Sequence, residues 1–119
     1  MIRIVGLQRD SDPRKEFVLL QNQGSMRVCL KGHALLSESA GEKPNFAVIR
    51  DDACLMPGQY ALVRTCSGTP RWDTKTDGYP VYYVYLGESE SLWTEEYVPV
   101  HVLAPQHSYC ERTKELLML

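Results

Sequence analysis

Short apolar runs rich in β-branched and aromatic residues alternate with turn residues along most of this chain. Such spacing is typical of an all-β domain, because each run is as short as an ordinary strand and is bounded by Gly, Pro, Asn or Asp. No strand–helix–strand alternation is present, so a dinucleotide-binding site is not expected. The strands predicted in this way cover residues 2–7, 17–20, 26–30, 33–36, 46–49, 60–64, 81–86 and 97–103.

Two of these segments indicate their place in a sheet. Alternation over residues 81–86 places Val81 with Tyr83 and Tyr85 on one face and Tyr82 on the other, and one of the two faces must belong to the core. Pro99 has no N–H to donate, so the segment 97–103 is expected at a sheet edge, or to begin at residue 100.

The sequence also predicts the turns and loops that connect these strands. Residues 22–25 are expected to form a hairpin loop in which Gly24 is free to take a positive φ. Pro57 and Gly58 occupy the central positions of a predicted type II turn. Residues 66–80 form the longest stretch without predicted structure. The segment 111–119 is expected to form a short C-terminal helix, with a strand as the alternative.

Composition limits the possible classes of protein. A chain of 119 residues with 44% hydrophobic residues suits one domain, residues 1–119. The net charge is −2, and the acidic excess lies late in the chain, so the clustered cations of a nucleic-acid-binding surface are not expected. No apolar stretch reaches the roughly 18 residues of a membrane helix, and no signal peptide is evident; we therefore expect a cytoplasmic protein without membrane insertion.

Two segments resemble the lamin-tail domain family. Residues 16–25 read Glu-Phe-Val-Leu-Leu-Gln-Asn-Gln-Gly-Ser, and residues 28–35 read Val-Cys-Leu-Lys-Gly-His-Ala-Leu. The family has an acidic–aromatic–apolar run, a turn with Asn and Gly, and then Val-Asp-Leu-x-Gly-Trp-x-Leu. Phe46, the Leu55-x-Pro57-Gly58 segment and Trp93 extend the similarity over residues 2–93. The chain departs from the family at Cys29, which replaces Asp, at His33, which replaces Trp, and after Trp93, where the usual glycine-turn hairpin is absent.

The resemblance implies an immunoglobulin-like β-sandwich of about seven to nine short strands that serves as a non-catalytic protein-interaction or scaffolding module. It also raises the possibility of a nucleic-acid accessory domain, which the charge disfavours. We expect no enzyme activity and no cofactor. The partner is expected to be a protein of unknown identity, or a second copy of this chain.

A zinc site and a cysteine nucleophile are two alternatives to a non-catalytic module. Cys29 with His33, and His107 with Cys110, offer two thiolates and two imidazoles for a zinc ion. However, the spacing is not that of a zinc knuckle, and in a reducing cytosol all four cysteines, including Cys66, are expected to be free thiols. A cysteine nucleophile would need a base such as His101 or His107 beside it, and no such signature is present.

A carboxylate pair is the third enzymatic alternative. Asp51 with Asp52, and Asp73 with Asp77, are the candidates, but neighbouring aspartates on a strand point to opposite faces. Turn formation therefore explains them better.

Two surfaces are candidates for binding a protein partner. Arg71, Trp72 and Tyr79 lie in the stretch 66–80 and are of the residue types found at interaction hot spots. Trp72 can equally cover the core. The second surface consists of Tyr83 and Tyr85, if their face of the strand is exposed.

Overall fold

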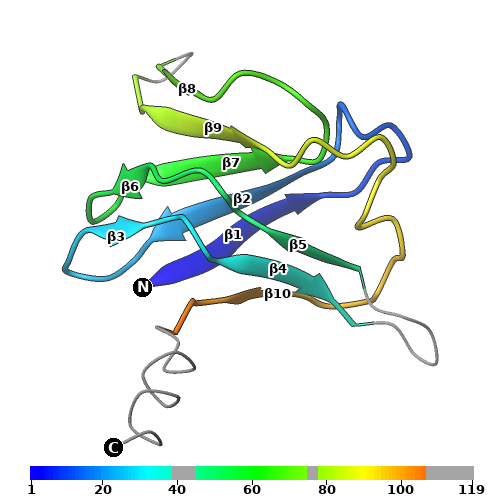
Figure 1. Ribbon diagram of the computed structural model, residues 1–119, viewed down its shortest axis with the longest axis horizontal. Helices are drawn as coiled ribbons and strands as arrows, with labels where there is room; N and C mark the ends of the chain where they lie inside the picture. The colour runs from blue at the N-terminus through cyan, green and yellow to red at the C-terminus, as the bar shows by residue number, and fades with distance from the viewer. Residues whose placement is uncertain (39–44, 75–77, 107–119) are drawn as a thin grey trace, which may run out of the picture.

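The computed structural model describes residues 1–38, 45–74 and 78–106, and these residues contain strands and no helix (Figure 1). Accordingly, no helix in the described part of the chain could cross a membrane. The ten strands are β1 (Ile2–Gln8), β2 (Phe17–Asn22), β3 (Val28–Cys29), β4 (Ala34–Ser37), β5 (Phe46–Val48), β6 (Cys54–Leu55), β7 (Tyr60–Arg64), β8 (Arg71–Asp73), β9 (Val81–Tyr85) and β10 (Val100–Leu103).

The larger layer is a five-stranded sheet in the order β1-β2-β7-β9-β8. Neighbouring strands are antiparallel except for β7 and β9, which run parallel. The register of β1 against β2 shifts between Ile4 and Gly6, so β1 carries a bulge at this edge.

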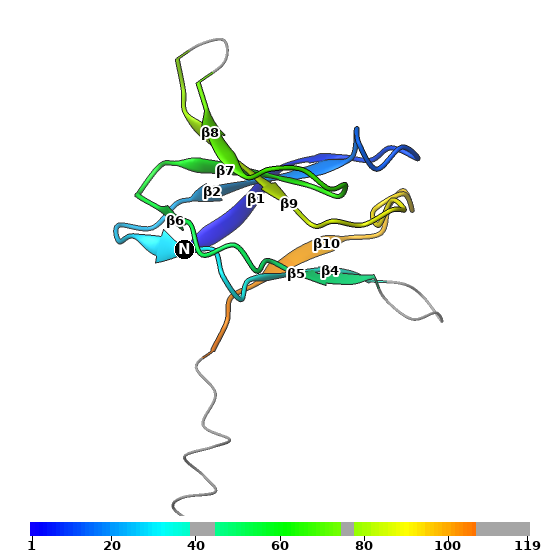
Figure 2. The same cartoon turned by 45° about the horizontal axis from the view of Figure 1, so that its top comes forward.

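The second layer is smaller. It contains the three-stranded sheet β10-β4-β5 and the two-stranded ribbon β3-β6. Figure 2 shows the two layers facing each other, with β10, β4 and β5 below the five-stranded sheet. The all-β sandwich expected from the sequence is thus confirmed.

The core lies between the layers and is built from alternate strand residues. In β2, Val18 and Leu20 are fully buried, and in β7, Ala61 and Val63 are. Their neighbours in each strand are only half-buried, as strand periodicity requires. The smaller layer contributes Leu30, Leu35, Ile49 and Leu55.

A buried carboxylate holds the edge of this core. Glu16 has no exposed surface, and it lies directly before β2. It accepts hydrogen bonds from the Thr65 hydroxyl at 2.6 Å, the Leu92 N–H at 2.8 Å and the Trp93 N–H at 3.0 Å. The three donors compensate for burying the charge, which would otherwise be strongly unfavourable.

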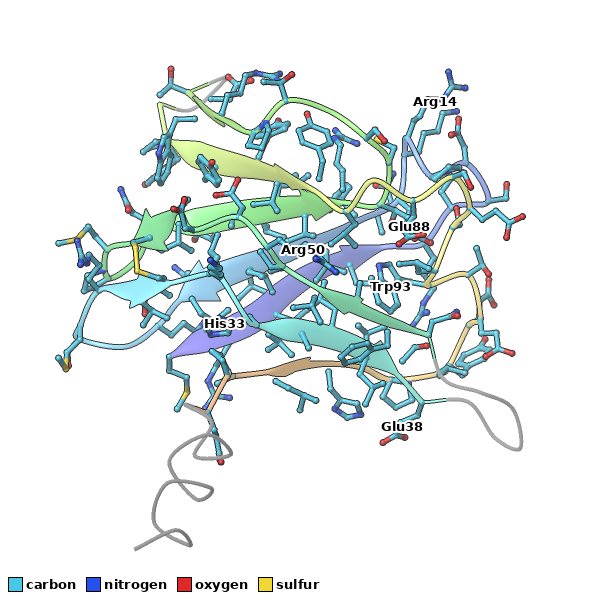
Figure 3. The ribbon with its side chains drawn as sticks, in the orientation of Figure 1. Arg14, His33, Glu38, Arg50, Glu88 and Trp93 are labelled. Atoms are coloured by element: carbon cyan, nitrogen blue, oxygen red, sulfur yellow. A yellow bond between two sulfur atoms is a disulfide. The ribbon has the colours of Figure 1, made fainter. Side chains whose placement is uncertain are left out.

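A second residue, Arg9, holds the backbone of Trp93. The Arg9 guanidinium donates to the Trp93 carbonyl at 2.6 Å and to the Val98 carbonyl at 2.8 Å. The Trp93 side chain is 1% exposed and points into the interior from the loop that precedes β10 (Figure 3). One loop is thus fixed over the end of the core by residues from both ends of the β1–β2 connection.

Most expected strands are present, and several local predictions are confirmed. β10 begins at Val100 and is an edge strand. Gly58 has a φ of 86°, and the Gln59 N–H donates to the Met56 carbonyl, as in the predicted type II turn. The predicted C-terminal helix lies outside the described residues.

Two local expectations are wrong. The stretch 66–80 is not free of regular structure, because β8 lies within it and pairs with β9. Residues 22–25 do not form a hairpin loop, because β2 and β3 belong to different sheets, and Gly24 does not take a positive φ. Instead the Asn22 side chain accepts the Gly24 N–H at 3.0 Å and shapes the loop by itself.

Glu16→Gln tests the buried carboxylate. Glutamine keeps one oxygen but directs an NH2 group at a donor, so we expect the free energy of unfolding to fall by about 2–4 kcal/mol. Urea unfolding followed by tryptophan fluorescence measures the change. Glu88→Gln is the matched control, because Glu88 is exposed and should leave the midpoint unchanged. Equal midpoints for the two variants would contradict the assigned role.

Candidate functional site

The outward face of the five-stranded sheet carries a continuous band of aromatic, aliphatic and arginine side chains. Strand register places Leu19, Leu62 and Tyr83 in one row, which ends at Arg71 on β8. The adjacent row contains Phe17, Arg64 and Tyr85. Apart from Arg71, which is exposed, all of these residues are half-buried. We call this set of seven residues the arginine–aromatic face: Phe17, Leu19, Leu62, Arg64, Arg71, Tyr83 and Tyr85.

Cation–π contacts order this face. The Arg64 guanidinium carbon lies 5.9 Å from the centre of the Phe17 ring and 5.8 Å from that of Tyr83. The Arg71 guanidinium carbon lies 5.2 Å from the centre of the same Tyr83 ring. Both distances to Tyr83 are within the range of favourable cation–π interaction, so Tyr83 contacts one arginine from each of the two strands that flank β9.

Both arginines have further anchors. Arg64 donates to the Arg14 carbonyl at 2.8 Å, and Arg71 contacts the Tyr85 hydroxyl at 3.5 Å. Arg71 also lies 3.7 Å from the Asp73 carboxylate. Both guanidinium groups are therefore held in place.

The predicted binding residues do not all lie on one surface. Trp72 is directly opposite Tyr82 in the β8–β9 pair, on the core side of the sheet, and their ring centres are 5.2 Å apart. Trp72 remains 42% exposed, so it both covers the sheet edge and contacts solvent. Tyr79 is 68% exposed and precedes β9. Only Arg71, Tyr83 and Tyr85 of the five predicted residues belong to the arginine–aromatic face.

A hydrogen bond between Tyr82, which contacts Trp72, and Asp51 joins the two layers. The Tyr82 hydroxyl donates to Asp51 Oδ2 at 2.9 Å, while Asp51 Oδ1 accepts the Ala53 N–H. Burial, followed by this hydrogen bond and the charge of Asp51, raises the pKa of Tyr82 to about 12. Asp51 thus has a structural role in a turn, in keeping with the interpretation made from the sequence.

The expectation that all four cysteines are free thiols is wrong for two of them. Cys29 and Cys54 are directly opposite in the β3–β6 ribbon and form a disulfide. Strand pairing brings the two sulfurs together, which spacing along the sequence could not reveal. In this state Cys29 cannot offer a thiolate to zinc. Cys66 is a free thiol.

The other proposed metal ligands do not form a site in the described residues. His33 is buried and its Nδ1 lies 3.0 Å from the Leu30 carbonyl, so Nδ1 carries the proton. His107 and Cys110 lie outside the described residues. Within residues 1–38, 45–74 and 78–106, no group of three or more His, Cys, Asp or Glu residues could hold a metal ion.

The thiol and carboxylate alternatives likewise find no assembled site in the part of the chain that is described. Cys66 follows β7 in the five-stranded sheet, whereas His101 lies on β10 in the other layer. His101 Nε2 contacts Glu38 Oε1 at 3.0 Å. Asp73 lies beside Arg71, and Asp77 lies outside the described residues.

Sequence reasoning missed a groove of about 980 Å³ between the two layers. Its walls come from β1, β3 and β10 and from the connections next to them. Arg27, Lys31 and His33 lie in one short segment, but Arg3 and His101 join them from distant strands, which local sequence patterns do not show. The lining includes Arg3, Arg27, Lys31, His33 and His101.

No protein-family model matches this chain, and no curated protein sequence matches it. The fold and the surfaces described above therefore carry the functional argument.

The pH dependence of stability tests the state of His33. Burial lowers the pKa of His33 below its ordinary value of 6.5. Just below pH 6.5 His33 is therefore protonated in the unfolded chain but still neutral in the folded protein. The free energy of unfolding decreases as the pH falls from about 6.5 to the lowered pKa of the folded state. We expect the free energy of unfolding to decrease there by at most about 1.4 kcal/mol per pH unit.

His33→Asn removes the titration while an amide can still donate to the Leu30 carbonyl. Urea unfolding between pH 5 and pH 7.5 should show a smaller pH slope for this variant than for the parent. A parent slope that persists in His33→Asn would disprove the assignment.

Proposed function

We propose that this protein is a non-catalytic interaction module similar to a lamin-tail domain, and that it binds a protein partner through the arginine–aromatic face. The observation that carries the proposal is the pair of arginines held over Tyr83 on the outward side of the larger sheet. Among the described residues no strand of the smaller layer pairs over this face, although the β1–β2 loop bonds to Arg64 at its edge and Gly68, in the loop before β8, lies against the Tyr85 ring.

The chemistry of the face suits protein recognition. Tyr and Arg are the residue types that most often dominate binding energies, and they are most effective when already ordered. Arg64 is positioned by Phe17, Tyr83 and the Arg14 carbonyl, so little side-chain freedom is lost on binding. Leu19 and Leu62 supply apolar area next to these cations.

The cytoplasmic location predicted from the sequence stays a proposal, and the Cys29–Cys54 disulfide argues against it, because disulfides are rare in the cytosol. In a reducing cytosol Cys29 and Cys54 would be thiols inside the cell. When cells are quenched in acid and the denatured protein is then alkylated at neutral pH, both cysteines should react, as mass spectrometry would show. Protein that resists alkylation at Cys29 and Cys54 until a reductant is added would rule out this location.

A face variant tests the interaction surface. Leu62→Lys combined with Tyr83→Ala places a charge in the apolar row and removes the ring that orders both arginines. We expect proteins that co-purify with the parent to fall roughly tenfold or more with this variant, because few residues dominate an interface. Quantitative mass spectrometry of the co-purified proteins measures the loss, and light scattering measures self-association in parallel.

The control makes matched changes outside the face. Met26→Lys combined with Met56→Ala alters two exposed apolar residues near the β3–β6 ribbon and should retain the partners. Circular dichroism should show that both variants are folded. Partners retained by the folded face variant, or lost equally from the control, would contradict the proposal.

A further inference from the structure

The groove between the layers is bordered by two strands that each have one free edge. β1 is the outer strand of the five-stranded sheet, and β10 is the outer strand of the β10-β4-β5 sheet. Both strands line the groove. In residues 1–38, 45–74 and 78–106, β10 pairs only with β4, so the outward N–H and C=O groups of alternate residues in β10 have no strand partner.

The interior of the groove is apolar. Ile2 and Ile4 approach it from β1, and Val100 and Val102 approach it from β10. All four residues belong to the core or pack against it. An extended segment laid along β10 could therefore bury every second side chain against this surface.

The charged side chains that line the groove are cationic. Arg3, Arg27 and Lys31 line it, and all three are exposed. Asp and Glu are absent from its lining, although the protein as a whole has a net charge of −2. Among the described residues, none of the three cations forms an ion pair.

The two histidines of the groove add little to this charge. Burial lowers the pKa of His33, so its ring is neutral at pH 7. His101 faces the Glu38 carboxylate at 3.0 Å, which offsets its charge when it is protonated. The attraction for anions at neutral pH thus rests on the two arginines and the lysine.

We propose that this groove binds an extended peptide segment of a partner protein, in which acidic residues alternate with apolar ones. The segment adds as a strand to the free edge of β10, directs its apolar side chains inward and places its carboxylates near Arg27 and Lys31. Main-chain hydrogen bonds provide affinity in such strand addition, and side chains provide selectivity. The volume of about 980 Å³ is at the upper end of the range for ligand sites, about 300–1,000 Å³.

A synthetic peptide tests the proposal on the full chain. The probe is a fluorescein-labelled Glu-Val-Glu-Val-Glu-Val peptide, and fluorescence anisotropy at low and moderate salt measures its binding. We expect saturable binding that weakens with salt. The Lys-Val-Lys-Val-Lys-Val peptide should bind at least about tenfold more weakly, because it would place like charges beside the groove.

Two comparisons separate strand addition from simple ion pairing. Methylating alternate backbone nitrogens of the acidic peptide removes N–H donors without changing charge, and binding should be lost for one of the two methylation patterns. Arg27→Glu combined with Lys31→Glu should weaken binding at least about tenfold. Lys15→Glu is the control and should not affect binding, because exposed Lys15 lies next to Arg14, which Figure 3 shows far from the groove residue His33.

Three results would overturn the proposal. The first is failure of the acidic peptide to bind at low salt. The second is equal binding by both methylated peptides, since this would indicate attraction by charge alone. The third is a dimer of the parent that dissociates in the Arg27→Glu/Lys31→Glu variant, since a second copy would then occupy the groove. Because these variants leave the arginine–aromatic face intact, their outcome is independent of the proposed function.

Discussion

The buried carboxylate of Glu16 is the interaction on which the arrangement of the two layers depends. It ties the start of β2 to Thr65 at the end of β7 and to the loop that carries Trp93. Trp93 in turn fills the end of the core, and Arg9 fixes its carbonyl. Both functional surfaces rely on this order, because the arginine–aromatic face lies on β2 and β7, while β10 follows the anchored loop.

Much of the fold could be predicted because it follows from local rules. Alternation and turn chemistry located β1, β2, β7 and β9 to within two residues of their observed ends. Pro99 indicated the start of β10, since a residue without an N–H cannot extend the ladder. β8 was missed because Arg71, Trp72 and Asp73 have no strand pattern of their own, and only pairing with β9 makes them a strand.

The surfaces were less predictable, for a related physical reason. Alternation correctly grouped Tyr83 with Tyr85, but it could not decide which face of the strand was the core. Placing Phe17, Leu62 and Arg71 beside them requires the order of four strands. The disulfide depends on strand pairing across 25 residues of sequence, and the groove depends on the packing of β1 and β10 beside the β3 segment; neither spacing nor composition encodes these contacts.

The link between Glu16 and Trp93 also bears on how the protein is made. The two residues are 77 positions apart, so the carboxylate at the start of β2 has no backbone donors from the later loop until most of the chain has been synthesised. During synthesis on the ribosome, β1 and β2 are therefore made before the backbone donors that satisfy the Glu16 carboxylate beside their apolar face. The core of this domain therefore packs late in folding. Until the loop that carries Trp93 has been made, we expect the growing chain to depend on chaperones.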